Sequence, residues 1–158
     1  MANYEQALPD QGRLMAVDAG ERRVGVAVCD ELQTVATPLA VVSRRSRAED
    51  FGRLGRLAQE QQVVGLVVGH PLDADDTAGP QARRAARYGH RLAGALALPV
   101  LLWDEHGSSQ EAARRLAEAG KRRRDEPLDA EAAAVILQDY LDTRRRERAT
   151  TGPPNAAQ

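Results

Sequence analysis

The sequence predicts an α/β domain built on a five-stranded mixed sheet flanked by helices, with its elements in the order βββαβαβα. Three observations predict this class. Short, valine-rich apolar runs come first and are separated only by turns. From residue 48 onward, apolar residues recur at helical spacing between further strand-like runs. The chain has 158 residues, of which 42% are hydrophobic, so it can bury one core.

The first three predicted strands follow one another closely in the sequence. Residues 14–19 form a short apolar run, which is typical of a strand buried on both faces. Residues 24–28 alternate valine with small residues. The turn at 20–23 is short enough to join these two strands in a hairpin. A third strand is predicted at 35–42, where Pro38 favours an edge position because proline cannot donate a ladder hydrogen bond.

A helix and a buried strand follow the third strand. Phe51, Leu54 and Leu57 share one face of a predicted helix at 48–61. Residues 63–68 are continuous, apolar and largely β-branched, as strands in buried parallel sheets are. The change from helical to strand-like pattern at residue 62 therefore predicts a helix that leads into the fourth strand.

The second half of the chain repeats this alternation. A helix with a proline in its first turn and a stripe of small apolar residues is predicted at 80–96. A fifth strand follows at 99–103. A serine–glutamate capping box opens a helix at 108–120, which a glycine ends. A basic loop at 121–126 leads to a last helix at 128–146.

The connections between these elements predict the topology of the sheet. Crossover helices make the first, fourth and fifth strands parallel to one another, whereas the hairpin extends the sheet on the other side of the first strand. The direction of winding therefore changes at the carboxyl end of the first strand. Open α/β sheets bind their ligands at such a point.

The ends of the chain and its composition narrow the class of protein. Residues 1–12 are expected to be a flexible leader, 13–146 the folded domain, and 147–158 a disordered tail. The single cysteine excludes an intrachain disulfide and disfavours a cysteine-based zinc site. No apolar run is long enough to cross a bilayer, and the start lacks a signal-peptide pattern. We therefore expect a cytoplasmic protein without a membrane partner.

Two acidic positions follow predicted strands at the same edge of the sheet. Asp18 ends the first strand, and Asp104 with Glu105 ends the fifth. Neighbouring residues of a strand point to opposite faces, so only one of that pair faces a site directly, and Asp104 is the better candidate for capping the next helix. Asp18 has a structural alternative as well, because an aspartate can cap the turn over Gly20.

Asp129 is the carboxylate that fits its surroundings least. Ala133, Ile136, Leu137 and Tyr140 follow it at the spacing of one helix face, which is expected to pack on the sheet. A carboxylate at the head of a core-facing stripe is costly unless its charge is compensated. The helix dipole offers a structural explanation, since it favours an anion in the first turn.

Carboxylates that converge at one edge of a sheet would repel one another. A hard divalent cation removes this repulsion, because Mg²⁺ prefers oxygen ligands and keeps several waters. Two such ions about 3.5–4 Å apart can activate a water and stabilise the leaving oxygen in phosphodiester hydrolysis. Asp18, Glu105 and Asp129 are therefore the predicted catalytic residues and metal ligands, with Mg²⁺ or Mn²⁺ as cofactor.

The basic residues are clustered, although the formal net charge is only −1. Each run has an ordinary explanation as a solvated surface, but four runs together favour a polyanionic partner. The four runs are Arg44, Arg45 and Arg47; Arg83, Arg84 and Arg87; Lys121, Arg122, Arg123 and Arg124; and Arg144, Arg145 and Arg146.

Four ordered motifs resemble those of the YqgF/RuvX family. They are VDAG at 17–20 with RVGVA at 23–27, VVGHPL at 67–72, WDE at 103–105, and LDAEAA at 128–133. The resemblance runs from about residue 14 to residue 142, nearly the whole predicted domain. It implies an RNase H-like nuclease domain at 13–146, related to Holliday junction resolvases. Members of the family mature the 5′ end of pre-16S ribosomal RNA, and some resolve junctions; their acidic residues match Asp18, Glu105 and Asp129.

Some positions depart from the family pattern. Arginine and leucine usually follow the Asp-Glu pair, whereas this chain has His106 and Gly107. Histidine titrates near neutrality, so a basic group beside the scissile phosphate would become pH-dependent. His70 stands where the family usually has leucine. These departures bear on rate and substrate more than on the fold.

The leading hypothesis is a divalent-metal-dependent endonuclease acting on structured nucleic acid, either pre-16S rRNA or a four-way DNA junction. In it Asp18 bridges two metal ions, and Glu105 and Asp129 each hold one. A resolvase makes paired cuts, so a homodimer is possible. The residues expected to bind phosphates are Arg22, Arg23, Arg83, Arg84, Arg87, Lys121, Arg122, Arg123 and Arg124.

Two alternatives belong to other classes. A non-catalytic RNA-binding ribosome-assembly factor on the same fold would bind RNA without metal-dependent turnover, and the departures at His106 and Gly107 favour it. An actin-like or sugar-kinase ATP-binding protein is suggested by the Asp-Ala-Gly sequence at 18–20. Such proteins need a second similar domain, for which 158 residues are too few.

Overall fold

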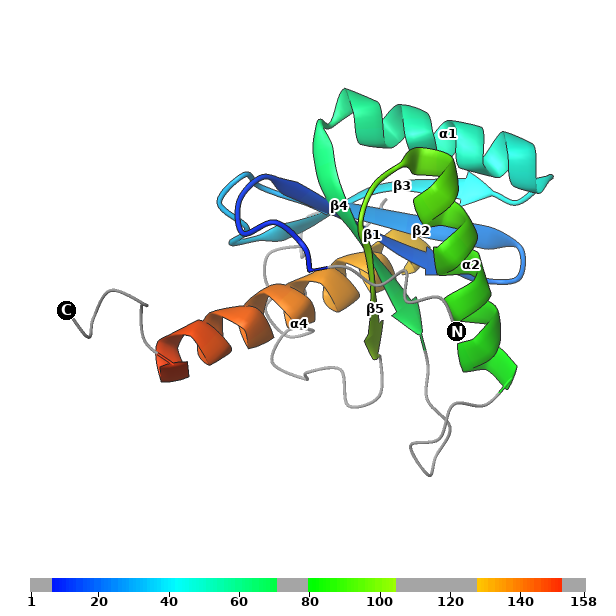
Figure 1. Ribbon diagram of the computed structural model, residues 1–158. Helices are drawn as coiled ribbons and strands as arrows, with labels where there is room; N and C mark the ends of the chain where they lie inside the picture. Colours follow the sequence, from blue (N-terminus) through cyan, green and yellow to red (C-terminus); the bar gives the residue numbers. More distant parts are fainter. Residues whose placement is uncertain (1–6, 71–79, 105–127, 152–158) are drawn as a thin grey trace.

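The computed structural model describes residues 7–70, 80–104 and 128–151 and has the predicted α/β architecture. A five-stranded mixed sheet lies between α1 and α2 on one face and α4 on the other (Figure 1). The helix expected at 108–120 lies outside the described residues. The elements are β1 (Arg13–Ala19), β2 (Arg23–Cys29), β3 (Ala36–Ser43), α1 (Arg47–Glu60), β4 (Val63–His70), α2 (Pro80–Leu96), β5 (Val100–Asp104) and α4 (Leu128–Thr151).

The strand order, β3-β2-β1-β4-β5, confirms the predicted topology. β1 pairs antiparallel with β2, and β2 with β3, whereas β1, β4 and β5 run parallel. β3 is an edge strand, as Pro38 indicates. The ladder between β2 and β3 shifts its register between Val26 and Ala27, where Ala27 pairs with Pro38. β1 is the central strand, with β2 and β3 added on one side of it and β4 and β5 on the other.

The core has two layers because successive strand residues face opposite sides of the sheet. Met15 and Val17 of β1 pack with Leu54 and Leu92 under α1 and α2. Leu14 and Ala16 pack on the other side, under α4. The predicted stripe of α4 is buried there, since Ala133, Ile136, Leu137 and Tyr140 all belong to this second layer.

Buried polar contacts hold α4 on the sheet. The Gln138 side-chain carbonyl accepts a hydrogen bond from the backbone N–H of Ala36 at 2.9 Å, and its amide group donates to Thr34 and to Asp142. Asp139 accepts a hydrogen bond from the indole of Trp103 at 2.9 Å. A buried polar group without such partners would oppose folding, so these contacts define how α4 sits against β3 and β5.

The structure differs from the expected bounds at both ends of the domain. Leu8 is buried in the second core layer, although residues 1–12 are expected to form a flexible leader. α4 continues to Thr151, beyond its predicted end near Arg146. The two ends stabilise each other, because Asp10 forms ion pairs with Arg144 and Arg148. Long-range ion pairs of this kind leave no periodic pattern in the sequence.

Within the described part of the chain, no helix is long and apolar enough to span a bilayer.

Candidate active site

Asp18 lies near the carboxyl end of the central strand β1, where the winding of the sheet changes direction. It is half-buried and pairs across the antiparallel ladder with Gly25 of β2. By alternation along β1 it belongs to the same face as Leu14 and Ala16, which pack under α4. The structure therefore places Asp18 at the predicted edge of the sheet, on the side where α4 begins.

Gly25 allows the first turn of α4 to approach Asp18. A Cβ atom built on Gly25 would lie 1.9 Å from the backbone carbonyl oxygen of Asp129 and 2.4 Å from its carbonyl carbon. No side chain fits in this space, so only glycine lets the helix start here. Because Gly25 is the ladder partner of Asp18, this contact brings Asp129 to the same place in the fold.

The carboxylates of Asp18 and Asp129 interact electrostatically. Burial raises the pKa of Asp18 above its ordinary value of 3.8, and the negative charge of Asp129 raises it further. Asp129 also forms an ion pair with Arg23, whose Nε lies 2.8 Å from Oδ2 of the carboxylate. The Asp129 side chain is 39% exposed, so it remains open to a ligand. Arg23, which the sequence assigns to phosphate binding, thus has an acidic partner in the structure.

The raised pKa of Asp18 predicts a pH-dependent difference in stability between the protein and an Asp18→Asn variant. The folded state holds the Asp18 proton more strongly than the unfolded chain does, so stability falls as the pH rises from 3.8 through the raised pKa. We expect the variant to have the higher melting temperature at neutral pH in EDTA, with the difference disappearing in acid. A variant that is less stable than the unsubstituted protein at neutral pH would contradict this.

The third predicted ligand, Glu105, lies outside the described residues. β5 runs parallel to β4, with Asp104 paired to His70 at the end of the ladder, so the chain leaves β5 at the same edge of the sheet as Asp18. Within the described ranges, no three His, Cys, Asp or Glu side chains form a metal-binding group. The two carboxylates present supply the oxygen donors that Mg²⁺ and Mn²⁺ prefer, and a cation would offset their repulsion, so the donor set fits such an ion.

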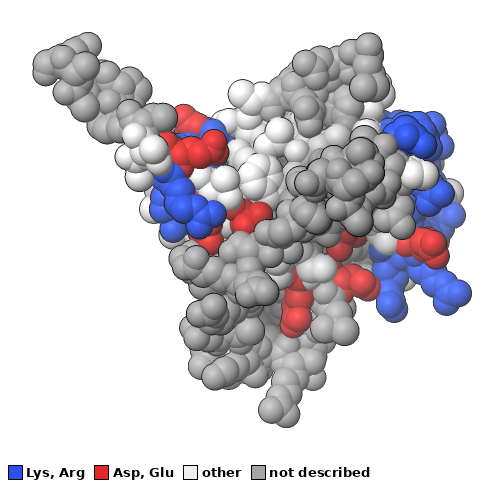
Figure 2. Space-filling model, turned by 90° about the horizontal axis from the view of Figure 1, so that it is seen from below, with Lys and Arg blue, Asp and Glu red and all other residues white. Residues whose placement is uncertain are grey.

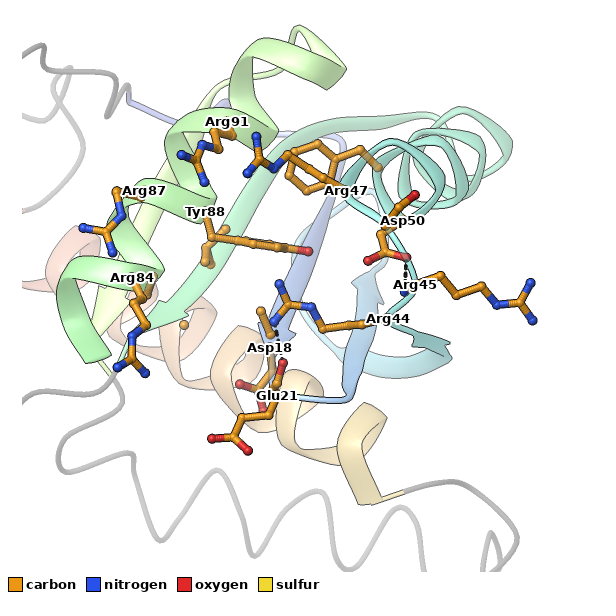
Figure 3. A pocket seen from close by; sticks show the side chains of 17 residues that line it. Asp18, Glu21, Arg44, Arg45, Arg47, Asp50, Arg84, Arg87, Tyr88 and Arg91 are labelled. Atoms are coloured by element: carbon orange, nitrogen blue, oxygen red, sulfur yellow. Dashed lines mark hydrogen bonds between the residues drawn. The ribbon is translucent and has the colours of Figure 1, made fainter. Parts of the chain in front are cut away.

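A cleft of about 640 Å³ borders Asp18 on the side of α1 and α2. In Figure 3, Asp18 and Glu21 lie at its lower end, α2 contributes Arg84, Arg87 and Arg91, and Arg44 extends between Tyr88 and the two carboxylates. Its charged lining consists of six arginines and three carboxylates: Arg44, Arg45, Arg47, Arg84, Arg87, Arg91, Asp18, Glu21 and Asp50. The cleft thus joins a basic surface to the acidic edge of the sheet.

The cleft contains only part of the predicted phosphate-binding set. Arg84 and Arg87 line it, whereas Arg22 and Arg83 are exposed outside its lining. Lys121, Arg122, Arg123 and Arg124 lie outside the described residues. The prediction omits Arg44, Arg91 and Tyr88, which do line the cleft. The basic run at 44–47 was a signal, but the sequence does not reveal that this segment packs beside α2.

Figure 2 views the molecule from below, the side to which β4 and β5 point in Figure 1. Acidic side chains lie in the middle of this face, and basic side chains gather at its right, on the side where Figure 1 places α2. A polyanion approaching this face would meet basic groups beside acidic ones. This distribution of charge favours a polyanionic partner on this side of the molecule.

Comparison with known sequences identifies clear relatives. The RuvX family, described as Holliday junction resolvase, matches residues 12–143. The "Putative pre-16S rRNA nuclease" of Anaeromyxobacter dehalogenans is 46% identical over 134 residues, which cover 84% of this chain and 98% of that protein. A protein of the same name from Syntrophus aciditrophicus is 40% identical over 138 residues, covering 86% and 92%.

Solved structures share the fold at low sequence identity. Thermus thermophilus RuvC, solved in complex with a Holliday junction substrate, superimposes with a TM-score of 0.55 at 17% identity and covers 85% of this chain and 96% of its own. The fowlpox virus Holliday junction resolvase has a TM-score of 0.50 at 12% identity, covering 84% and 99%. The chain therefore has an RNase H-like fold.

Proposed function

Because this chain belongs to the YqgF/RuvX family of nucleases, we propose that it is a divalent-metal-dependent endonuclease that cuts structured nucleic acid. One observation carries this proposal. The first strand and the last helix bring Asp18 and Asp129 together at the edge of the sheet where α/β proteins bind their ligands. Burial and the like charge of Asp129 both oppose ionisation of Asp18, and a bound metal ion would offset both. A cytoplasmic location, as the sequence predicts, belongs to the same proposal.

The carboxylates would hold the metal ions. Asp18, at the end of the central strand, would hold them together with Asp129 and Glu105. Mg²⁺ or Mn²⁺, when bound, supplies a Lewis acid for the phosphoryl oxygens and lowers the pKa of water. The half-buried position of Asp18 excludes part of the surrounding solvent and strengthens its electrostatic interactions. The fixed backbone contact at Gly25 keeps Asp129 in place beside it.

Basic residues around this edge would bind the nucleic-acid backbone. Arg84 and Arg87 line the cleft beside Asp18. Arg22 and Arg23 border the turn after β1, and Arg83 is exposed on α2. The basic segment Lys121, Arg122, Arg123 and Arg124 completes the proposed set. Phosphate contacts of this kind release counterions, so binding is expected to weaken steeply with salt.

Cleavage by the full chain tests the function and its substrate. We expect hydrolysis of a four-way DNA junction, of an RNA carrying the 5′ end of pre-16S rRNA, or of both, with Mg²⁺ or Mn²⁺ and not with EDTA. The relatives named as pre-16S rRNA nucleases favour the RNA. No cleavage of either substrate with either ion would overturn the proposal.

The oligomeric state distinguishes the two substrates. Paired cuts across a junction need two sites related by a two-fold axis, so a resolvase acts as a dimer. An enzyme that cuts one RNA strand has no such need. Light scattering with each substrate bound is expected to give a homodimer on the junction if the chain resolves junctions. A monomer on the junction would assign the chain to RNA processing.

The ion pair between Arg23 and Asp129 favours a second candidate function. An arginine at 2.8 Å compensates the Asp129 charge without a metal. A non-catalytic RNA-binding ribosome-assembly factor would use such a neutralised site for binding alone. It predicts tight, salt-sensitive RNA binding with no metal-dependent turnover. Arg23 does not contact Asp18 in this ion pair, so the half-buried Asp18 carboxylate remains available to a metal ion, which favours the enzyme.

A further inference from the structure

Arg44 is held in one orientation at the cleft that borders Asp18. Its guanidinium donates a 2.7 Å hydrogen bond to the carbonyl of Gly20, and it lies over the ring of Tyr88, with Cζ 5.6 Å from the ring centroid. Arginine has five N–H donors. The Gly20 contact uses one of them, and Arg44 is exposed, so further donors remain available to a ligand.

The segment that carries Arg44 is itself fixed. The Arg44 backbone N–H donates to the carbonyl of Arg22 at 2.8 Å. The next residue, Arg45, donates its N–H to the buried carboxylate of Asp50 at 3.0 Å. Ser46 then caps α1 by accepting a hydrogen bond from the N–H of Glu49. Because these hydrogen bonds hold its backbone in place, Arg44 loses little conformational entropy when it binds a ligand.

Tyr88 supplies a second donor beside Arg44. Its ring packs edge to face against Phe51, with the ring centroids 5.4 Å apart. Its hydroxyl is buried and has no hydrogen-bond partner within the described part of the chain. Burial raises the pKa of Tyr88 to about 12, so the hydroxyl keeps its proton at neutral pH. Buried hydroxyls nearly always have a partner, so this one marks a place where a ligand oxygen would be favoured.

We propose that Arg44, packed on the ring of Tyr88, and Arg91 of α2, which lines the same cleft, form a binding site for a backbone phosphate of the nucleic-acid strand that passes Asp18. This inference rests on the proposed function, because it assumes a nucleic-acid substrate. Six arginines against three carboxylates make the cleft suited to an anion. The phosphate bound there is a neighbour of the scissile one, since Asp18 and Glu21 occupy the lower end of the same cleft (Figure 3).

Arg44 also has a structural role that the test must separate from phosphate binding. By holding the Gly20 carbonyl it stabilises the turn that follows Asp18. Loss of that contact alone would weaken catalysis or stability without changing how binding depends on salt. Arg91 is exposed on α2 and is not part of the turn, so an Arg91→Ala variant tests the cleft independently of the turn.

The experiment measures binding of a labelled four-way DNA junction and a labelled pre-16S 5′-end RNA by fluorescence anisotropy, in EDTA, across a salt series. The full-length variants are Arg44→Ala, Arg91→Ala and Tyr88→Phe. Arg56→Ala is the matched control, because Arg56 is an exposed arginine of α1 that lies outside this cleft. Melting temperatures of all variants show whether they fold.

Arg44→Ala and Arg91→Ala are each expected to weaken binding about tenfold at moderate salt and to reduce the slope of log Kd against log salt by about 0.7–0.9. Tyr88→Phe is expected to weaken binding without changing the slope, because it removes no charge. Arg56→Ala is expected to change neither. If Arg44→Ala and Arg91→Ala match Arg56→Ala in affinity and slope, the inference is wrong. If the inference fails in this way while the unsubstituted protein still cleaves, the proposed function is unaffected. If binding depends on Arg44 and Arg91 but the unsubstituted protein does not cleave, the proposed nuclease activity is wrong and the phosphate site is supported.

Discussion

An Asp18→Asn variant is expected to lose metal-dependent cleavage, with the rate falling by about 10³-fold or more. The amide keeps the shape of the side chain but removes the charge that would hold the cation. Roughly 4 kcal/mol of transition-state stabilisation corresponds to such a factor. Cleavage of the RNA and of the junction at saturating Mg²⁺ or Mn²⁺ measures the effect. The variant is expected to be the more stable protein at neutral pH, so unfolding does not explain the loss.

Glu60→Gln provides the matched control for this experiment. Glu60 is an exposed carboxylate at the end of α1, away from the cleft, so its replacement is expected to leave cleavage unchanged. Substrate binding by Asp18→Asn is expected to survive, because the phosphate contacts come from arginines. If Asp18→Asn cleaves as fast as the control, Asp18 does not belong to the catalytic group and the proposed site is in the wrong place.

A Gly25→Ala variant is expected to be less stable by about 3 kcal/mol, at the upper end of the range for overpacked sites. The added methyl group would lie 1.9 Å from the Asp129 carbonyl oxygen, far inside van der Waals contact. The first turn of α4 must therefore move away from β2, and Asp129 moves with it. Chemical denaturation measures the stability. Cleavage is expected to fall more than the unfolded fraction explains, because the two carboxylates separate.

Gly52→Ala is the control for a glycine that is replaced without a clash. A Cβ atom on Gly52 of α1 would meet nothing within 4 Å. Alanine in the interior of a helix is more favourable than glycine, so this variant is expected to gain about 0.5–1 kcal/mol. Comparing the stability of Gly25→Ala with that of Gly52→Ala separates the effect of the steric clash from the general effect of replacing a glycine. A Gly25→Ala protein with unchanged stability and cleavage would show that α4 tolerates displacement.

The pattern of apolar residues predicts most of the fold because each element buries one face. Alternation along β1 and β2 and the stripe of α4 that follows Asp129 correspond to the two core layers. Pro38 indicates the edge strand for a local reason, the missing backbone N–H. The position of Asp18 follows from the topology, since crossover connections define which strand ends share an edge. The core layers, the edge strand and the position of Asp18 can therefore be predicted, because each depends on local chemistry or on general rules of chain connection.

The contacts that assemble the site come from tertiary packing, which leaves no periodic signal. Gly25 is recognisable as a small residue in a strand, but the helix that needs its small size lies far along the chain. The ion pair of Arg23 with Asp129 and the position of Arg44 over Tyr88 likewise join segments that are distant in sequence. Glu105 stays a prediction, because it lies outside the described residues.

The last helix in the sequence both covers one face of the sheet and carries Asp129. A chain that does not yet include α4 lacks Asp129 and leaves uncovered the aliphatic face of β1 and β4 on which that helix packs. In such a chain Asp18 lacks the Asp129 carboxylate that the packed helix places beside it. The proposed site would therefore be assembled only after α4 has packed on the sheet, so the same contacts that complete the core would also complete the pair of carboxylates.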